Sequence, residues 1–369
     1  MVFAPFDPQI LTQRLGSWLL TRGPESDVVV SCRVRLARNL DGFPFITRLK
    51  PERAAVVCKR IERVLGLREF SGESYWIPME DASPVLRLML RERHLVSRDL
   101  APTDPRISNR PGRAVAFNLD ETLSVMVNEE DHLRLQSLSP GFSLRDSYDR
   151  IRGVDIELEE ELGYAFSSQF GYLTGCPTNV GTGLRASVML HLPALGLVRK
   201  ELEKVFSAAQ STGLAVRGMY GEGSRAGGDF YQISNQVTLG RSEDDLIADL
   251  EDLVPCIVAF EQRVRTMLYE EQSSALEERV QRSLGTLRTA RSMRSDVALV
   301  HLSNVRLGAC LGLVGGISTM EVNCLAVQIQ KGHVHILAGG TVDTHLADPT
   351  ERDMLRAAFL RRRLAELSS

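Results

Sequence analysis

The pattern of apolar and polar positions divides the chain into a first part rich in strands and a second part rich in helices. Alternating or β-branched stretches between turn residues predict strands over residues 28–36, 114–118, 122–128, 132–136, 215–220 and 230–239. Helical spacing predicts helices over residues 11–20, 51–67, 83–96 and 143–162, and another that follows an apolar run at 186–192 and ends near 210. The first part therefore reads as an α+β domain.

From residue 242 onward the character changes, and leucine, alanine, glutamate and arginine recur at helical spacing. We place the domain boundary near Arg263, with an α+β domain over residues 1–262 and a mainly helical C-terminal domain over residues 263–369. The helix-rich stretch 242–302 is expected to build the interface between the domains and a surface for self-association.

Composition excludes several classes of protein. The 369 residues are 43% hydrophobic and 25% charged, as in globular proteins, and the formal net charge of −3 favours neither nucleic acid nor anionic membranes. No apolar run approaches the roughly 18 residues that a membrane span needs, and the N-terminus lacks the layout of a secretory signal. We therefore expect a cytoplasmic protein that binds neither membranes nor nucleic acid directly.

Cysteine and histidine positions give no sign of a metal centre. The six cysteines contain no CxxC pair and no zinc-ligand spacing, which indicates reduced thiols. His333 and His335 alternate on a stretch that we predict to be a strand, and no ligand partner lies near them in the sequence. We predict no metal site built from protein side chains.

Arginines alternate with apolar residues along the first predicted strand, in Ser31-Cys32-Arg33-Val34-Arg35. Alternation places both arginines on one face and the apolar residues on the other. The arginines are either a solvated strand face or an anion cradle, since guanidinium groups match phosphate oxygens in bidentate geometry.

Three consecutive acids, Glu129, Glu130 and Asp131, follow the apolar strand that ends near residue 128. Such a run is typical of an exposed turn. The alternative is a carboxylate directed at a cationic substrate, with Arg134 holding an anion nearby. Two glycine-rich segments, 171–185 and 217–223, offer backbone N–H groups to phosphates, and neither matches a Walker A or GxGxxG motif.

Together these segments resemble the guanidino kinase (phosphagen kinase) superfamily. The resemblance is carried in family order by CRVRLARN (32–39), NEEDHLRLQ (128–136), GYLTGCPTNVGTGLR (171–185), and VRGMYGEG (216–223) with YQISNQVTLG (231–240). It extends over residues 27–249 and implies a largely antiparallel sheet flanked by helices. It also implies ATP as a substrate, with Mg²⁺ bridging phosphate oxygens.

The resemblance implies a cage of arginines around the ATP phosphates. Its nucleotide-binding positions are Ser31, Cys32, Arg33, Val34, Arg35, His94, Arg134, Arg185, Ala186, Ser187, Val188, Met189, Arg217, Gly218, Met219, Tyr220, Gly221 and Glu222. Arg87 is a further candidate for the cage. On the acceptor side, Glu130 is expected to orient the guanidinium and take its proton, Glu222 to hold it from another side, and Cys176 to tune the electrostatics.

Two positions depart from the family pattern. Cys32 stands where serine is common, and Arg225 stands where family members often carry a glutamate that faces the substrate. The second change reverses a charge and bears on substrate preference.

Creatine and free-arginine kinases carry a helical N-terminal domain before the first arginine strand, and because Arg33 comes so early in this sequence we expect that domain to be absent. In this it resembles the bacterial protein-arginine kinases (McsB type). Their RDxxRA motif, which binds phosphoarginine allosterically, is matched by Arg352, Asp353, Arg356 and Ala357. Residues three or four apart share one helix face, so two arginines can clamp a phosphoryl group there.

These observations predict a kinase that transfers the γ-phosphoryl group of ATP to arginine side chains of proteins. The family implies a homodimer or larger assembly, a possible activator protein, and coupling to Clp-type degradation. Two alternatives remain open. One is a phosphagen kinase acting on free arginine or another small guanidine, and the other is a phosphoarginine-binding adaptor without catalysis.

Overall fold

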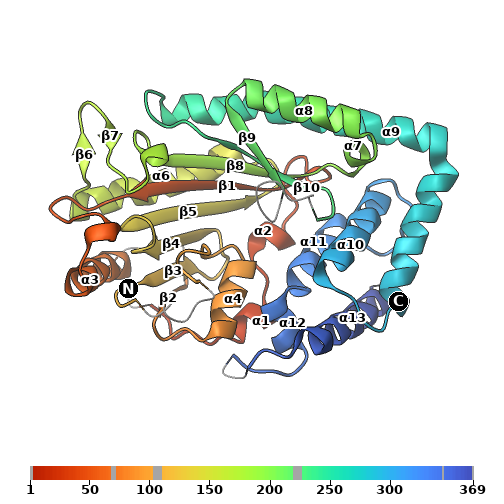
Figure 1. Cartoon of the computed structure of the whole chain (residues 1–369), viewed down its shortest axis with the longest axis horizontal. Coiled ribbons are helices and arrows are strands. Elements are labelled where there is room, and N and C mark those ends of the chain that lie inside the picture. The colour runs from red at the N-terminus through yellow and green to blue at the C-terminus, as the bar shows by residue number, and fades with distance from the viewer. Residues whose placement is uncertain (1–2, 68–71, 103–109, 219–226, 343–344, 368–369) are drawn as a thin grey trace.

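The computed structural model describes residues 3–67, 72–102, 110–218, 227–342 and 345–367. Its centre is an eight-stranded sheet with the order β2-β3-β4-β5-β1-β8-β10-β9, in which all neighbouring strands are antiparallel (Figure 1). The strands are β1 (Val29–Arg38), β2 (Ser74–Pro78), β3 (Ala114–Asn118), β4 (Leu123–Val127), β5 (Leu133–Pro140), β8 (Leu184–His191), β9 (Leu214–Gly218) and β10 (Phe230–Asn235). β6 (Phe166–Ser167) and β7 (Gly171–Tyr172) form a separate hairpin.

Helices surround the sheet and form the C-terminal region. They are α1 (Ile10–Gln13), α2 (Ser17–Leu20), α3 (Pro51–Leu67), α4 (Pro84–Glu92), α6 (Leu144–Leu162), α7 (Pro193–Leu197), α8 (Arg199–Ser211), α9 (Glu243–Thr289), α10 (Ser295–Cys310), α11 (Thr319–Gln328), α12 (Lys331–Leu337) and α13 (Pro349–Glu366). The predicted α+β class, with its antiparallel sheet and helical C-terminal region, is confirmed. None of the described helices is long and apolar enough to cross a membrane.

One face of the sheet is buried under helices, and the other is only partly covered. Apolar side chains of α6 recur at helical spacing, from Leu144 and Tyr148 to Leu158 and Leu162, and pack on the core behind β1 and β5. On the opposite face, α4 covers the β2–β4 end with a second core around Phe117. The middle of that face, over β1 and β8, is not covered by α4.

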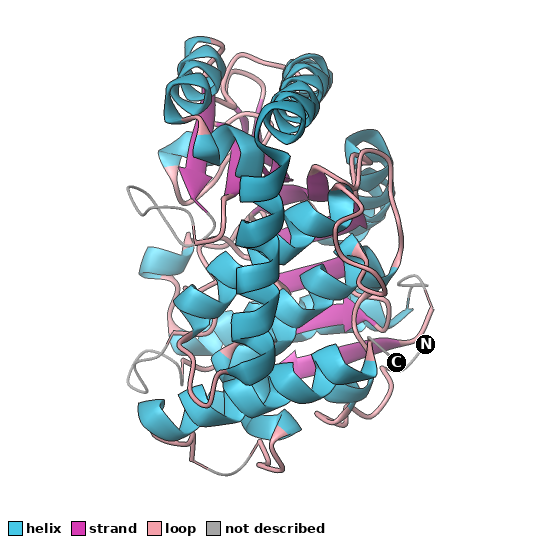
Figure 2. Ribbon diagram, turned by 90° about the vertical axis from the view of Figure 1, so that its right-hand side faces the viewer, coloured by secondary structure: helices cyan, strands magenta, loops and turns pink. Residues whose placement is uncertain are grey.

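The C-terminal helices α10 to α13 lie beside one end of the strands and in front of the sheet in the turned view (Figures 1 and 2). Helix α9 joins the two regions. Its first half packs on the sheet through residues such as Leu250, and its second half packs on α10 and α13 through residues such as Leu284. The backbone leaves helical geometry at Gln272 (φ −140°, ψ 37°). The predicted boundary between residues 262 and 263 lies inside this helix and stays a prediction.

Two sequence-based assignments of secondary structure are wrong. The opening helix predicted over residues 11–20 is two short helices, α1 and α2, because the backbone between them is extended at Arg14 (φ −130°, ψ 134°) and Gly16 (φ −62°, ψ 151°). The predicted strand around His333 and His335 is helix α12. The Glu92 carboxylate of α4 accepts hydrogen bonds from the backbone N–H groups at the start of this helix, Gly332 N (2.9 Å) and His333 N (3.1 Å). This capping group lies 240 residues away in the chain.

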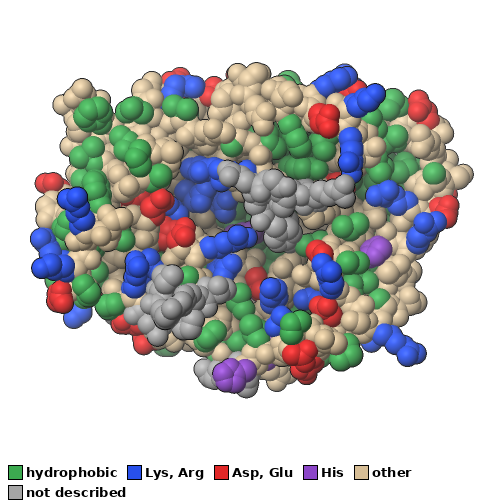
Figure 3. Space-filling view, in the orientation of Figure 1, with side chains coloured by type: hydrophobic (Ala, Val, Ile, Leu, Met, Phe, Trp, Pro, Cys, Tyr) green, Lys and Arg blue, Asp and Glu red, His purple; other side chains and the backbone are tan. Residues whose placement is uncertain are grey.

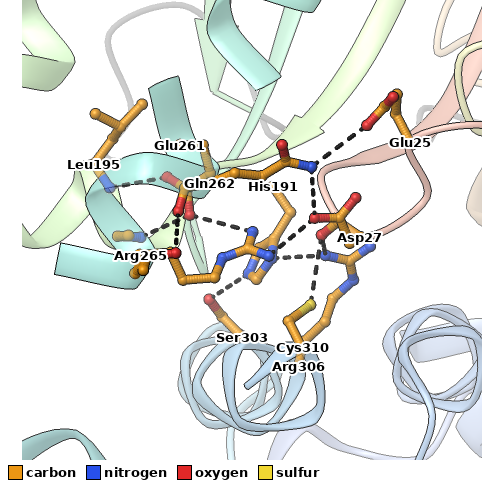
Figure 4. A network of polar contacts seen from close by, with 12 residues as sticks. Glu25, Asp27, His191, Leu195, Glu261, Gln262, Arg265, Ser303, Arg306 and Cys310 are labelled. Carbon is orange, nitrogen blue, oxygen red and sulfur yellow. Dashed lines mark hydrogen bonds and ion pairs between the residues drawn. The ribbon is translucent and has the colours of Figure 1, made fainter. Parts of the chain in front are cut away.

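A buried polar network connects the sheet to α10 (Figure 4). Arg306 donates to the carbonyls of Ser26 and Asp27 just before β1, each at 2.8 Å, and to His191 Nδ1 at the end of β8, also at 2.8 Å. His191 Nε2 lies 2.8 Å from Ser303 Oγ. Because Arg306 occupies Nδ1 as a donor, His191 carries its proton on Nε2 and donates to Ser303. The C-terminal region is therefore hydrogen-bonded to the start of β1 and the end of β8.

Glu261 of α9 gives this region a pH-dependent stability. Burial raises its pKa from 4.5 to about 7, although Arg265 and the N–H groups of Ala194 and Leu195 favour the charged form. Between these two pH values the folded state binds more protons than the unfolded state, so this group's contribution to stability falls as pH rises from about 4.5 to 7. Urea unfolding across this range is expected to show wild type losing stability relative to Glu261→Gln, with the difference constant above pH 8. A pH-independent difference would contradict the assignment.

Candidate functional site

Strand register gathers five arginines on one face of the sheet. Arg35 of β1 lies directly opposite Arg185 of β8, and Ala37 lies opposite Arg134 of β5. Residues directly opposite in an antiparallel pair project to the same side. The same alternation puts Arg33 beside them and, across β10, brings Arg217 opposite Gln232. Arg33 Nη2 donates to Gln232 Oε1 at 2.9 Å.

This arrangement is electrostatically unfavourable without an anion. Burial, together with Arg185 and Arg134, lowers the pKa of Arg33 to about 10. Burial and the neighbouring arginines also lower the pKa of Arg35, and no described residue accepts a hydrogen bond from its Nε. Like charges directly opposite on neighbouring strands destabilise a sheet. The face therefore carries concentrated positive charge, which a polyanion such as a nucleoside triphosphate would neutralise.

A cavity of about 200 Å³ opens over β1 and β8. It is lined by Arg35, Ala37, Glu130, Arg134, Cys176, Thr178, Asn179, Gly183 and Arg185. Figure 3 shows the basic side chains gathered in a hollow of this face, with acidic side chains beside them. The cavity thus joins three cage arginines to two of the predicted acceptor-side residues, Glu130 and Cys176.

The three consecutive acids have three different environments. Glu129 is buried and accepts from Arg134 Nη1 and from the Ser97 hydroxyl. Glu130 is 40% exposed at the cavity and accepts from Arg134 Nη2 at 2.5 Å. Asp131 is buried and accepts from Asn39 Nδ2 and from the Gly175 N–H, each at 2.6 Å. The outer two acids therefore fix the turn, and the middle one is presented to the cavity.

The first glycine-rich segment supplies the far wall of the cavity. Cys176 Sγ lies 3.0 Å from Thr178 Oγ1 in the turn that Asp131 holds at Gly175. Gly183 has φ +64°, and a Cβ there would collide with the Ala37 carbonyl of β1. Glycine is required at this point because φ is positive and the neighbouring β1 backbone leaves no room for a Cβ.

His94 lies at the edge of the arginine face, after α4. Its backbone is left-handed (φ +60°), its carbonyl accepts from Gln136 Nε2 at 2.7 Å, and its ring meets Trp18 edge-on. Burial, with Arg33 nearby, lowers its pKa to about 4, so the ring is neutral at pH 7. The predicted cage candidate Arg87 instead donates to the Met79 carbonyl and does not line the cavity.

Alternation separates the other predicted nucleotide positions on β1 and β8. The side chains of Ser31, Ser187 and Met189 share the face of the arginines. Those of Cys32, Val34, Ala186 and Val188 are in the core on the opposite face. Gly218 ends β9, whereas Met219, Tyr220, Gly221, Glu222 and Arg225 lie outside the described residues.

Sequence reasoning missed Gln232 and Ser234, which hold cage arginines from β10. Ser234 Oγ accepts from Arg185 Nη2 at 3.2 Å. Both residues are polar positions that alternate with Tyr231 and Ile233, so the period-two pattern carried a usable signal.

The C-terminal RDxxRA residues lie on α13. Arg356 is buried and donates to the carbonyls of Ile329 (2.7 Å) and Met293 (2.8 Å) and to Asp353 (2.5 Å). Arg352 donates to the Ala347 carbonyl at 2.7 Å, and Ala357 is buried. In this structure Arg356 ties α13 to neighbouring segments.

Comparison with known proteins defines the class. The family model described as the C-terminal catalytic domain of ATP:guanido phosphotransferases matches residues 56–264. Among solved structures, a taurocyamine kinase of Schistosoma mansoni is 27% identical with a TM-score of 0.58, covering 68% of this chain and 36% of that one. A lombricine kinase is 25% identical with a TM-score of 0.58, covering 72% and 73%. The fold is that of a guanidino phosphotransferase.

Within this class the C-terminal region distinguishes the family to which the chain belongs. Residues 273–369 match the model of the protein-arginine kinase McsB C-terminal domain. The protein-arginine kinase of Bacillus subtilis is 43% identical over 352 residues, which are 95% of this chain and 93% of that protein. The protein-arginine kinase of Pelotomaculum thermopropionicum is 42% identical over 353 residues, or 95% and 96%. The chain belongs to the protein-arginine kinase family.

Proposed function

We propose that this protein transfers the γ-phosphoryl group of ATP to arginine side chains of proteins, with the cavity over β1 and β8 as the site of transfer. The observation that carries the proposal is the shared cavity, in which Arg35 and Arg185 face Glu130. One wall suits a polyphosphate and the other suits a guanidinium. Phosphoryl transfer requires little more than such positioning and charge neutralisation.

On the nucleotide side, Arg33, Arg35, Arg134, Arg185 and Arg217 bind the phosphates, and neutral His94 borders them. Their strands are held in register by the sheet, so their charges are in place before ATP binds. Preorganised donors of this kind stabilise the charge that develops on the transferring group.

Mg²⁺ is expected to arrive with the nucleotide. The described residues contain no group of three acidic, histidine or cysteine side chains that could hold a metal ion, and Glu129 and Glu130 already pair with Arg134. Phosphate oxygens are therefore its natural ligands, as is common for this cation. When bound it adds to the neutralisation of phosphate charge.

On the acceptor side, Glu130 already binds a guanidinium in the structure, that of Arg134. An incoming arginine can replace Arg134 at Glu130, because Arg134 keeps its pair with buried Glu129. The substrate nitrogen attacks the γ-phosphorus, the bond to the ADP oxygen breaks, and Glu130 takes the proton that the nitrogen loses. Cys176 borders the acceptor without forming a covalent bond, and Glu222 remains a proposed second acceptor-side acid.

Regulation is part of the proposal. We assign phosphoarginine binding to Arg352, Asp353, Arg356 and Ala357, and we expect a cytoplasmic homodimer or larger assembly. Arg356 would have to exchange some of its present carbonyl partners to contact a phosphoryl group. An activator protein and Clp-type degradation of the marked proteins are proposed from the family alone.

Incubation of the full chain with ATP, Mg²⁺ and a disordered arginine-containing protein tests the function. Mass spectrometry under conditions that preserve P–N bonds is expected to locate phosphoarginine on the protein. Free arginine serves as the comparison substrate. Faster labelling of free arginine would instead identify a small-guanidine kinase, and phosphoarginine binding without ATP turnover would identify an adaptor.

A further inference from the structure

Four large apolar side chains are exposed on two segments that contact the glycine-rich wall of the cavity. Phe166 (59% exposed) and Phe170 (45%) are on the β6–β7 hairpin, and Val237 (58%) and Leu239 (49%) follow β10. Figure 3 shows apolar side chains gathered over the hairpin, beside the hollow with the basic residues. We call these four residues the apolar rim.

Backbone contacts tie the rim to the cavity wall. The hairpin pairs with the wall segment, where Tyr172 N donates to the Gly181 carbonyl at 2.8 Å. Thr238, between the two aliphatic rim residues, donates from Oγ1 towards the carbonyls of Thr178 (3.0 Å) and Val180 (2.6 Å). Both halves of the rim therefore belong to segments that bond directly to residues 178–181, and Thr178 of this stretch lines the cavity.

The hairpin is held firmly from below. The Arg38 guanidinium lies over the Tyr172 ring, 3.6 Å from its centroid, and is paired with buried Asp155 at 2.7 Å. The Phe166 ring packs edge-on against the same tyrosine at 5.4 Å between centroids. Phe166 is thus held on one side by Tyr172 and exposed to solvent on the other. A side chain held in this way is preorganised for contact with a ligand.

A protein substrate must extend out of the cavity, because its arginine is attached to a backbone. The cavity of about 200 Å³ is smaller than the roughly 300–1,000 Å³ of pockets that enclose a drug-sized ligand. It has room for a guanidinium and a phosphoryl group, so the residues that flank the target arginine remain outside. Glu130 attracts the guanidinium of the target arginine into the cavity. The residues next to that arginine in the substrate chain then contact the rim.

Resting on the function proposed above, we infer that the apolar rim binds apolar side chains next to the target arginine in an extended substrate segment. Buried apolar residues of a folded protein are not available for this contact, whereas those of an unfolded segment are. The rim therefore favours arginines that have apolar neighbours in the sequence. A small guanidine lacks such neighbours and gains nothing from it.

Steady-state kinetics with two peptides tests the inference. One peptide carries a single arginine flanked by leucines, and the other carries it flanked by serines. Wild type is expected to show a lower KM for the leucine peptide. Val237→Ser/Leu239→Ser and, separately, Phe166→Ser/Phe170→Ser are each expected to raise that KM about 5- to 10-fold, since each removes partial burial of apolar groups. The KM for ATP and for the serine peptide should stay within twofold.

Val297→Ser/Val300→Ser is the matched control, because both valines are comparably exposed (42% and 44%) on α10. It is expected to leave both peptides unaffected. Equal KM values for the leucine peptide in wild type and in both rim variants would overturn the inference while leaving the kinase function intact. Absence of labelling of either peptide by wild type would overturn both. Light scattering completes the test, since a rim variant that dissociates an oligomer would make the rim a subunit interface and overturn the inference.

Discussion

Arg35→Gln is expected to lower kcat/KM for protein phosphorylation by about 10²–10³-fold, as loss of a preorganised donor to the reacting group does, while leaving the folded protein at least as stable as wild type. Arg35 is opposite Arg185 in the sheet, and among the described residues nothing accepts from its Nε. Removing its charge relieves repulsion with Arg33, Arg134 and Arg185. Activity and stability should therefore change in opposite directions.

Two measurements check this expectation. Phosphoryl transfer is followed with a protein substrate, and the free energy of unfolding is obtained from urea titration without nucleotide. Arg291→Gln, at an exposed position after α9, is the control and should change neither quantity. A loss of stability equal to that of a buried structural arginine would show that Arg35 serves the fold and not the nucleotide.

Glu130→Gln is expected to lower kcat by about 10²–10⁴-fold, the range that a positioned general base supplies, with little change in the KM for ATP. Glutamine keeps the shape of the side chain and an acceptor oxygen, but it cannot take the proton from the attacking nitrogen. ATP binding should persist because Arg134 keeps buried Glu129 as its partner.

Single-turnover phosphorylation, together with nucleotide binding measured by titration, separates the two effects. Glu160→Gln, at an exposed position of α6, controls for loss of one surface carboxylate. Retention of wild-type turnover by the Glu130 variant would remove the proton-acceptor role. A parallel loss of ATP binding would instead place Glu130 in the nucleotide site.

The part of the arginine face that lies on β1 was predictable because it depends on local periodicity. A strand with arginine at every second position must present those arginines together, and the sequence shows this at Arg33 and Arg35 without any knowledge of neighbouring strands. The register that sets Arg185 opposite Arg35 is a property of two strands 150 residues apart. For that reason the resemblance to a known family, and not periodicity, predicted their meeting.

The acidic turn shows what a local pattern could not show. Three acids in succession suggest solvent, yet Glu129 and Asp131 are buried. Their partners Ser97, Asn39 and Gly175 come from three separate segments. Burial here depends on tertiary contacts that compensate the carboxylates, and no short-range signal reports such contacts.

The same reason explains the C-terminal motif. Helical spacing correctly placed Arg352, Asp353 and Arg356 on one helix. It could not reveal that Arg356 is turned inward to the carbonyls of Ile329 and Met293, which belong to other elements.

Because Arg306 is made late in translation, it affects when a newly made chain becomes active. Arg306 donates to the carbonyls of Ser26 and Asp27, just before the strand that bears Arg33 and Arg35. It is made some 280 positions later than Ser26 and Asp27. A growing polypeptide on the ribosome thus carries Arg33 and Arg35 long before Arg306, which binds the backbone just ahead of their strand, is made. Newly made enzyme should begin to label other proteins only once its last quarter has been translated and docked.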